Sequence, residues 1–210
     1  MKYAVRVLAE LAPDFFLAPE RHVAIAQTGD GVPLGELVSE RTDRVAVSSI
    51  ADAVILDTSH ARDGILDVAG ALRDLAGGKS AKKRALAGDL LVSRLRPYLR
   101  QIALVHPRAL AIADARPLAL STEFYVLAPR ERGDDLAFLV PFLLSADVQR
   151  ALASAQEGGH HPRVPRSSLL ALHVPRALLR TRKGTSRAVT AALGDFYEAS
   201  SRVRAQLDPK

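Results

Sequence analysis

The stretch GDLLVSRLRPYLRQIALV, residues 88–105, determines what architecture we expect for the rest of the chain. It reads as two apolar strands joined at Pro97, because β-branched and large apolar side chains predominate on both sides of that proline. Three arginines, Arg94, Arg96 and Arg100, stand among these strand formers. On one strand Arg94 and Arg96 would project from the same face, roughly 7 Å apart at about 3.3 Å per residue. The pattern predicts a pair of cations fixed on a rigid sheet.

Other segments indicate a mixture of strands and helices. Three of them have the composition and turn boundaries of strands, at 45–59, 117–130 and near 169–174. From Asp134 to Ala155 apolar residues recur at intervals of three and four, which predicts a helix with Pro141 as a position for a kink. Residues 184–186 precede a final helix that runs toward the C-terminus.

Length and composition limit the class of protein. The 210 residues suffice for one domain, or for one domain with an appended helical element. The composition, 48% hydrophobic and 25% charged, is typical of a soluble globular protein. The absence of cysteine fits a reducing compartment and excludes disulfides, thiolate nucleophiles and cysteine-bound metals. No apolar run is long enough to span a membrane and no secretion signal is recognisable, so we expect a cytoplasmic protein without membrane contact.

The net charge of +6 is unevenly distributed. The window 79–108 holds eight lysines and arginines against Asp89 alone, giving +7, and the window 160–187 holds seven against no acid, giving another +7. The remaining residues must then carry −8. For a single arginine, a salt bridge to this acidic remainder is the simpler interpretation. The segregation as a whole favours a polyanionic partner, with DNA first, because so many neighbouring cations cannot all find carboxylates nearby.

Residues of common catalytic sites occur without the spacing that catalysis requires. GGKS at 77–80 lacks the earlier glycine of a phosphate-binding loop, a position that Arg73 occupies. His160 and His161 are adjacent and form no metal-binding pair, so we expect no metal site. No G-x-S-x-G turn, nuclease carboxylate triplet on a strand or methyltransferase cofactor loop is present. Recognition is therefore favoured over catalysis, with a hydrolase based on Ser93 or His161 as the least favoured alternative.

The final helix carries an apolar seam. Its members recur at intervals of four, three, four, three and four residues, and they are Val189, Leu193, Phe196, Ser200, Val203 and Leu207. This spacing is typical of a coiled-coil contact between subunits. It is equally compatible with a helix that packs on the core of its own domain.

A series of short motifs follows a definite order along the chain. They are PLGELV at 33–38, GDLLVSR at 88–94, STEFYVL at 121–127, DLAFLVPFLLSADVQRAL at 135–152 and GGHHPRV at 158–164, with a strand and a long helix after them. This order resembles the target-recognition domain of type I restriction-modification specificity subunits. Each motif alone is degenerate, and the resemblance rests on their succession over residues 33–207.

The resemblance implies an α+β fold, in which a mixed, mainly antiparallel sheet with a packed helix precedes a long C-terminal helix. Residues 1–183 would form the DNA target-recognition domain, and residues 184–210 a helix for subunit pairing or docking. The implied function is non-catalytic: the chain would recognise double-stranded DNA and direct a partner adenine methyltransferase, with a restriction subunit as a further partner. The chain itself would need no cofactor, since S-adenosylmethionine is expected only on the methyltransferase.

Two departures from that family's pattern modify the expectation. Specificity subunits have two such domains, whereas this chain has one and so resembles a half-subunit. VPRALLRTRKGTSRA at 174–188 stands where a Pro-Pro-Leu-x-x-Gln stretch is usual, which puts the standard docking to a methylation subunit in doubt. A homodimer through the C-terminal helix, with Val189, Leu193, Phe196, Val203 and Leu207 at the interface, would restore two domains and read a split, symmetric site.

The resemblance also assigns the basic residues to DNA. Those expected to read bases are Arg94, Arg96, Ser121, Thr122, His161 and Arg163. Those expected in a flexible loop on the phosphates are Lys79, Lys82, Lys83 and Arg84. Further expected DNA contacts are Arg100, His160 and Arg166. The alternative from another class is a structural or interaction subunit whose basic faces dock an acidic protein or RNA.

Overall fold

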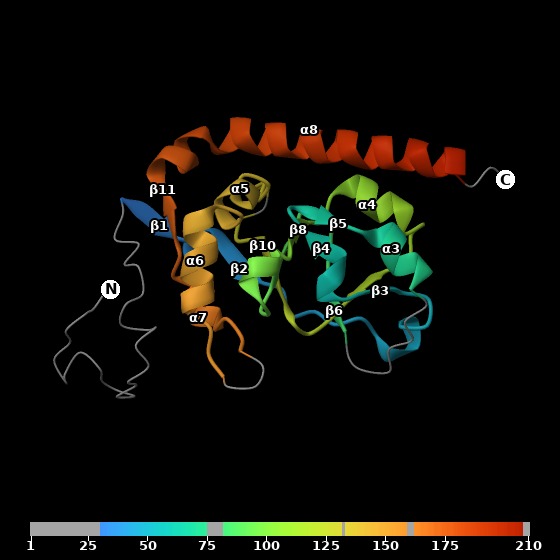
Figure 1. Cartoon of the computed structure of the whole chain (residues 1–210), viewed down its shortest axis with the longest axis horizontal. Coiled ribbons are helices and arrows are strands. Elements are labelled where there is room, and N and C mark those ends of the chain that lie inside the picture. Colours follow the sequence, from blue (N-terminus) through green and yellow to red (C-terminus); the bar gives the residue numbers. More distant parts are fainter. Residues whose placement is uncertain (1–29, 75–81, 132, 159–161, 208–210) are drawn as a thin grey trace.

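The computed structural model describes residues 30–74, 82–131, 133–158 and 162–207. A four-stranded sheet occupies the centre of the molecule, a smaller three-stranded sheet lies nearby, and one long helix runs along an edge of the whole (Figure 1). This combination of mainly antiparallel sheets with a long last helix confirms the predicted α+β class. No helix among the described residues is long and apolar enough to cross a membrane.

Antiparallel pairing dominates the sheets. The central sheet has the order β2 (Val38–Glu40), β10 (Phe124–Pro129), β7 (Leu90–Ser93) and β8 (Ile102–Leu104), with every neighbour antiparallel. In the smaller sheet β9 (Leu118–Leu120) pairs parallel with β3 (Val54–Leu56) and antiparallel with β6 (Lys83–Arg84). Two further antiparallel pairs lie in the described part of the chain: β1 (Gly31–Pro33) with β11 (His173–Pro175), and β4 (Ala61–Arg62) with β5 (Ile65–Leu66).

Short helices connect and cover these sheets. They are α2 (Leu34–Leu37), α3 (Val68–Arg73), α4 (Pro107–Ile112), α5 (Leu139–Leu143), α6 (Ala146–Ser154) and α7 (Arg166–Leu170), with 3₁₀ turns at Val47–Ser49, Thr58–His60 and Pro97–Leu99. The last helix, α8 (Arg176–Leu207), has 32 residues and is therefore about 48 Å long.

The stretch 88–105 forms the predicted strand pair, β7 with β8. The prediction that Arg94 and Arg96 share a strand face is wrong, because β7 ends at Ser93. There the Ser93 hydroxyl accepts a hydrogen bond from the Leu95 amide and donates one to the Leu95 carbonyl, and this local turn replaces the ladder. Arg96 then adopts the left-handed region at φ 43°, just before the turn at Pro97.

Three other predicted elements also differ from the structure. Residues 117–130 form two strands, β9 and β10, divided by a turn in which the Ser121 carbonyl accepts from the Phe124 amide. The helix predicted from Asp134 is divided at Ser145, whose hydroxyl accepts from the Val148 amide and so begins a new helix. The strand expected near 169–174 begins only at His173, after α7. The strand prediction for 45–59 is confirmed by one strand, β3.

Helix α8 begins at Arg176, eight or more residues before the predicted start, and continues through Gly184. Its middle belongs to the core: the Ser186 hydroxyl accepts from the Phe138 amide at 3.1 Å, and Leu193 is buried. The Tyr197 hydroxyl accepts from the Leu66 amide at 2.9 Å and donates to the Leu66 carbonyl at 3.2 Å. The reading of the seam as a core contact is therefore right for Leu193.

A buried ion pair holds the start of β7. Asp89 is 1% exposed, and its carboxylate accepts from Arg41 Nε at 2.8 Å, from a second Arg41 nitrogen at 3.1 Å and from the Leu86 amide at 2.8 Å. The hydrogen bond to Asp89 is the main reason that the pKa of Arg41 is raised. Gly88, at φ 84°, supplies the left-handed backbone of this turn. The Gly-Asp pair of the motif at 88–94 thus has a structural role.

We expect Asp89→Ala to lower the free energy of unfolding by about 3 kcal/mol, because it leaves a partly buried Arg41 and the Leu86 amide without their acceptor. Chemical denaturation measures this loss. Asp43→Ala is the matched control, since Asp43 also contacts Arg41, at 3.2 Å, but is 61% exposed and should cost about 0.5 kcal/mol. Equal losses for the two variants would contradict the assigned role of Asp89.

Candidate nucleic-acid interface

Charged side chains from distant parts of the chain gather around one tyrosine at the end of the central sheet. We call this set the Tyr125 cluster, and it consists of Glu40, Lys83, Arg94, Glu123, Tyr125, Arg163 and Arg166. The smaller sheet, the central sheet and α7 each contribute to it.

Glu40, at the end of β2, joins two of the cations. Its Oε1 accepts from Lys83 Nζ at 3.0 Å, and its Oε2 accepts from Arg166 Nε at 2.8 Å. Lys83 also donates to the Phe124 carbonyl at 2.7 Å, and its side chain is only 16% exposed. Arg166, at the first turn of α7, is 60% exposed. Lys83 is thus anchored inside the protein, whereas much of the Arg166 guanidinium faces solvent.

Glu123 holds Arg163 through two parallel hydrogen bonds. Arg163 Nε donates to Oε2 at 2.9 Å and a terminal nitrogen donates to Oε1 at 2.7 Å, which is the fork geometry that arginine forms with carboxylates. These bonds are the main cause of the lowered pKa of Glu123. The Arg163 side chain remains 40% exposed, so the pair fixes the orientation of a guanidinium that still reaches solvent.

Tyr125 lies beneath the cations. The guanidinium carbon of Arg94 is 5.4 Å and Lys83 Nζ is 5.9 Å from the centre of its ring, within the range of cation–π attraction. Burial raises the pKa of Tyr125, although Arg94 opposes the shift. The hydroxyl therefore stays protonated at neutral pH and donates to the Val164 carbonyl at 2.8 Å.

Backbone hydrogen bonds bring the segments of the cluster together. The Arg94 amide donates to the Glu123 carbonyl at 2.8 Å, and the Arg94 carbonyl accepts from the Val164 amide at 2.9 Å. A β-bridge pairs Leu95 with Arg163. The two basic sequence windows therefore meet at this point, because the chain after β7 is bonded on one side to the start of β10 and on the other to residues 163–164.

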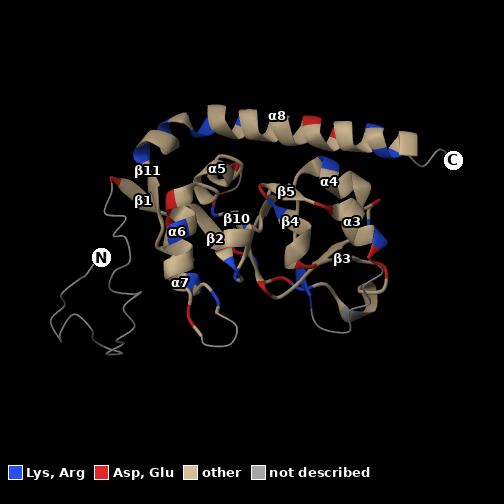
Figure 2. Ribbon diagram, in the orientation of Figure 1, with Lys and Arg blue, Asp and Glu red and all other residues tan. Residues whose placement is uncertain are grey.

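Not all cations of the two basic windows meet at the Tyr125 cluster, however. Arg163 and Arg166 join the cluster, but the other cations of the second window, Arg176, Arg180, Arg182, Lys183 and Arg187, lie on α8. Figure 2 shows α8 along the edge of the molecule opposite to β6 and α7, which carry Lys83 and Arg166. Figure 2 also shows acidic residues interspersed among the basic ones. The expectation that both windows form one surface is thus correct only for their nearer parts.

The other residues predicted to contact DNA are not members of the Tyr125 cluster. Arg100 is held elsewhere, by the Asp63 carboxylate and by the Leu144 carbonyl at 2.9 Å. Arg96 is exposed in the turn between β7 and β8. Ser121 and Thr122 form the turn that carries Glu123, and the Ser121 hydroxyl accepts from the Glu123 amide at 3.3 Å.

The basic segment near Lys83 is more regular than expected. Lys83 and Arg84 form β6, paired with Leu120 and Ala119, so the prediction of a flexible loop is wrong for these two residues. Lys82 is half-buried and Arg84 is exposed. Lys79, His160 and His161 lie outside the described residues, and their predicted contacts stay predictions. Among the described residues, no group of histidines and carboxylates is arranged to hold a metal ion.

Sequence reasoning missed Glu40, Glu123 and Tyr125. Glu123 and Tyr125 both lie in the quoted stretch STEFYVL, but Arg163, the partner of Glu123, lies 40 residues later in the chain. Glu40 gives no local signal either, because its contacts with Lys83 and Arg166 bridge residues far apart in the chain.

We expect neutralisation of Glu123 to remove a pH-dependent contribution to stability. Because the folded-state pKa of Glu123 lies below its ordinary value of 4.5, the contribution is present above that value and is lost as pH falls through the folded pKa. Glu123→Gln should therefore lower the free energy of unfolding by about 1 kcal/mol near neutral pH, and wild type and variant should converge in acid. Denaturation across pH measures this, with the exposed Glu131→Gln as control; a difference that persists in acid would contradict the assignment.

Comparisons with known proteins agree with this geometry at the level of the fold. No protein-family model matches the sequence, and no curated protein matches it. The solved structures that are similar include the following two. One is the HsdS subunit from Thermoanaerobacter tengcongensis, with 24% identity, a TM-score of 0.49 and 83% of this chain covered. The other is a chain from a structure on complex assembly and conformational transition of the type I R-M system, with 23% identity, a TM-score of 0.52 and 84% covered.

In both cases the match spans 44% of the other protein's length, so this chain corresponds to less than half of each. The likeness to the second structure shows a shared fold over most of the chain. The fold implied by the motif order at 33–207 is therefore the fold that a component of a type I R-M structure adopts.

Proposed function

We propose that the chain is a non-catalytic, sequence-specific double-stranded DNA recognition subunit of a type I-like restriction-modification or related phage-defence system. The observation that carries this proposal is the Tyr125 cluster, in which Lys83, Arg94, Arg163 and Arg166 converge on a fold shared with a component of a type I R-M structure. Such a subunit would direct a partner adenine methyltransferase to its site. S-adenosylmethionine would bind to that partner.

The carboxylates of the cluster favour sequence-specific over non-specific DNA binding. With Glu40 and Glu123 against four cations, the cluster carries a modest positive charge, and each exposed guanidinium is already oriented by an acid. A bidentate arginine contact with guanine discriminates by about 1–3 kcal/mol, provided that the fork is held in place. Arg163 and Arg166 are the cations that combine orientation with exposure.

Other basic residues would supply the contacts that position the duplex. Arg84, next to Lys83 in the chain, and Arg96, two residues after Arg94, are both exposed. Thr122 is exposed in the turn beside Glu123. Contacts of this kind with phosphates add affinity without sequence information, and they make binding fall steeply as salt is added.

We expect duplex binding to depend on the exposed arginines of the cluster. Duplexes selected from a random pool should bind the wild type with a steep salt dependence, measured by fluorescence polarisation at two salt concentrations. Arg163→Ala and Arg166→Ala should each weaken binding by roughly tenfold, whereas Arg150→Ala, an exposed arginine on α6 that contacts Asp147, should not.

Two outcomes would reject DNA reading. Salt-independent or absent binding to every duplex would contradict it directly. A protein complex that survives nuclease treatment, together with no enriched motif in the selected duplexes, would favour the alternative function, in which basic faces dock an acidic protein or RNA.

Exposed apolar side chains in the last turns of α8 favour pairing of this helix with a second copy of the chain. Phe196, Val203 and Leu207 are 43%, 58% and 74% exposed and lie on one side of the helix. Leu193 and Val189 would contribute less, because Leu193 is buried and Val189 is partly buried in the same domain.

We expect the double substitution Val203→Glu and Leu207→Glu to convert a dimer to a monomer while leaving the fold intact, because both side chains are exposed and each new charge would be buried in the pair. Sedimentation velocity measures the change. Gln206→Glu, an exposed neighbour outside the apolar side, is the matched control. A wild-type chain that stays monomeric at high concentration would reject the homodimer but leave DNA binding by a single copy untouched.

A further inference from the structure

The first half of α8 carries a basic surface that the Tyr125 cluster does not use. Its cations recur at intervals of four, three and four residues and so lie on one side of the helix, and we call them the basic flank: Arg176, Arg180, Lys183 and Arg187. Arg176 is paired with Asp30. Within the described parts of the chain, Arg180, Lys183 and Arg187 have no carboxylate partner.

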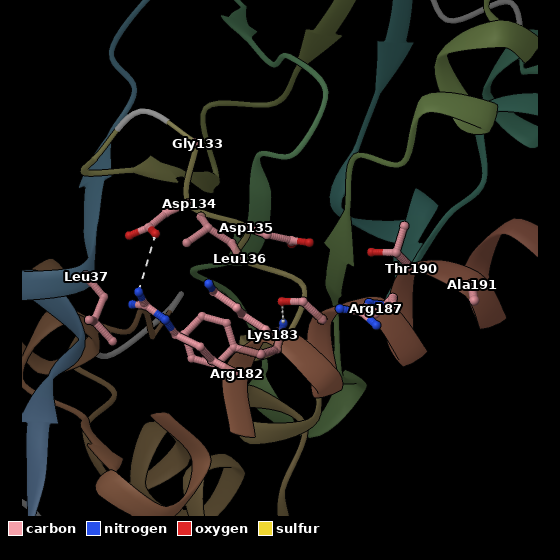
Figure 3. Close-up of a pocket in the computed structure, with 12 residues that line it drawn as sticks. Leu37, Gly133, Asp134, Asp135, Leu136, Arg182, Lys183, Arg187, Thr190 and Ala191 are labelled. Carbon is pink, nitrogen blue, oxygen red and sulfur yellow. Dashed lines mark hydrogen bonds and ion pairs between the residues drawn. The ribbon is translucent and has the colours of Figure 1, made fainter. Parts of the chain in front are cut away.

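A cavity of about 520 Å³ lies beside this flank. Figure 3 shows it between α8 and the segment from Gly133 to Leu136. Apolar side chains contribute to its lining, among them Leu37, Leu136, Phe138 and Ala191. Lys183 and Arg187 line it from the helix, and Asp134 and Asp135 line it from the opposite segment. The volume falls in the range of sites that bind small molecules or single side chains of a partner.

We propose that the cavity and the basic flank together form a docking surface for an acidic segment of a partner protein, which inserts an apolar side chain into the cavity. The unpaired cations of the flank supply the charge complementarity, and the apolar lining supplies the anchor that interfaces concentrate in desolvated pockets. This surface is additional to the proposed DNA recognition and does not depend on it.

The same features argue against a second DNA contact. A phosphate backbone has no apolar group to place in the cavity, whereas a polypeptide can insert one. Asp134 is paired with Arg182 at 3.8 Å, and an acidic polypeptide can place its carboxylates along Lys183 and Arg187 on the helix side of the cavity. Because α8 lies on the opposite edge from β6 and α7, such a partner could remain bound while the Tyr125 cluster faces a duplex (Figure 2).

The test is selection of a random peptide library on the immobilised full-length chain, in the absence of DNA. We expect the selected peptides to combine several Asp or Glu residues with a large apolar residue. The double substitution Lys183→Glu and Arg187→Glu should weaken their binding by about tenfold or more. Ala191→Trp should do so without a change of charge, because Ala191 is exposed and lines the cavity, where a bulky side chain takes the place of the anchor.

Matched controls separate docking from general effects. Arg202→Glu changes an exposed charge elsewhere on α8, and Ala192→Trp adds the same bulk at an exposed position that does not line the cavity; neither should weaken peptide binding. Selected peptides without acidic enrichment, or binding unaffected by Ala191→Trp, would overturn the proposal. Displacement of the peptides by a short duplex would also overturn it, by assigning the flank to nucleic acid. Loss of duplex binding in the Arg163 and Arg166 variants is measured separately, so the two proposals can fail independently.

Discussion

The antiparallel register between β10 and β7 determines where Arg94, Glu123 and Tyr125 of the Tyr125 cluster lie. Tyr125 is paired with Val92 and Phe124 with Ser93, so the residues that follow β7 meet the residues that precede β10. A slip of one residue would turn Tyr125 to the other face of the sheet and separate Arg94 from Glu123. The buried Asp89 carboxylate, with Arg41 and the Leu86 amide, holds the turn from which β7 enters this register.

The carboxylates of the cluster fix the orientation of arginine side chains that still remain available to a ligand. A free arginine on a surface samples many conformations, and ordering it on binding costs conformational entropy. The Glu123 fork with Arg163 restricts that freedom in advance, and Glu40 does the same for Arg166. Lys83 is the exception, because its contacts with Glu40 and the Phe124 carbonyl leave its ammonium little access to a ligand.

The sequence allowed the fold class, the strand pair at 88–105 and part of the basic convergence to be predicted, because composition and apolar spacing are local signals. Element ends were predicted less well where one side-chain hydrogen bond decides them, as at Ser93 and Ser145. The start of α8 was missed because Gly184 and the cations around it resemble a boundary, whereas the packing of Ser186 and Tyr197 against the domain sustains a continuous helix. Glu40 required long-range contacts that no spacing rule contains.

The hydroxyl of Tyr197 has a mechanical consequence for α8. A helix held only by apolar side chains can roll on the surface beneath it, because dispersion contacts have little directionality. Here one phenol bonds to both the amide and the carbonyl of Leu66, and the Ser186 hydroxyl, about three helical turns earlier, accepts a hydrogen bond from the Phe138 amide. Two directional anchors at different heights prevent rotation about the long axis. Any molecule that binds one side of α8 therefore finds the other sides of the helix at fixed angles to the domain.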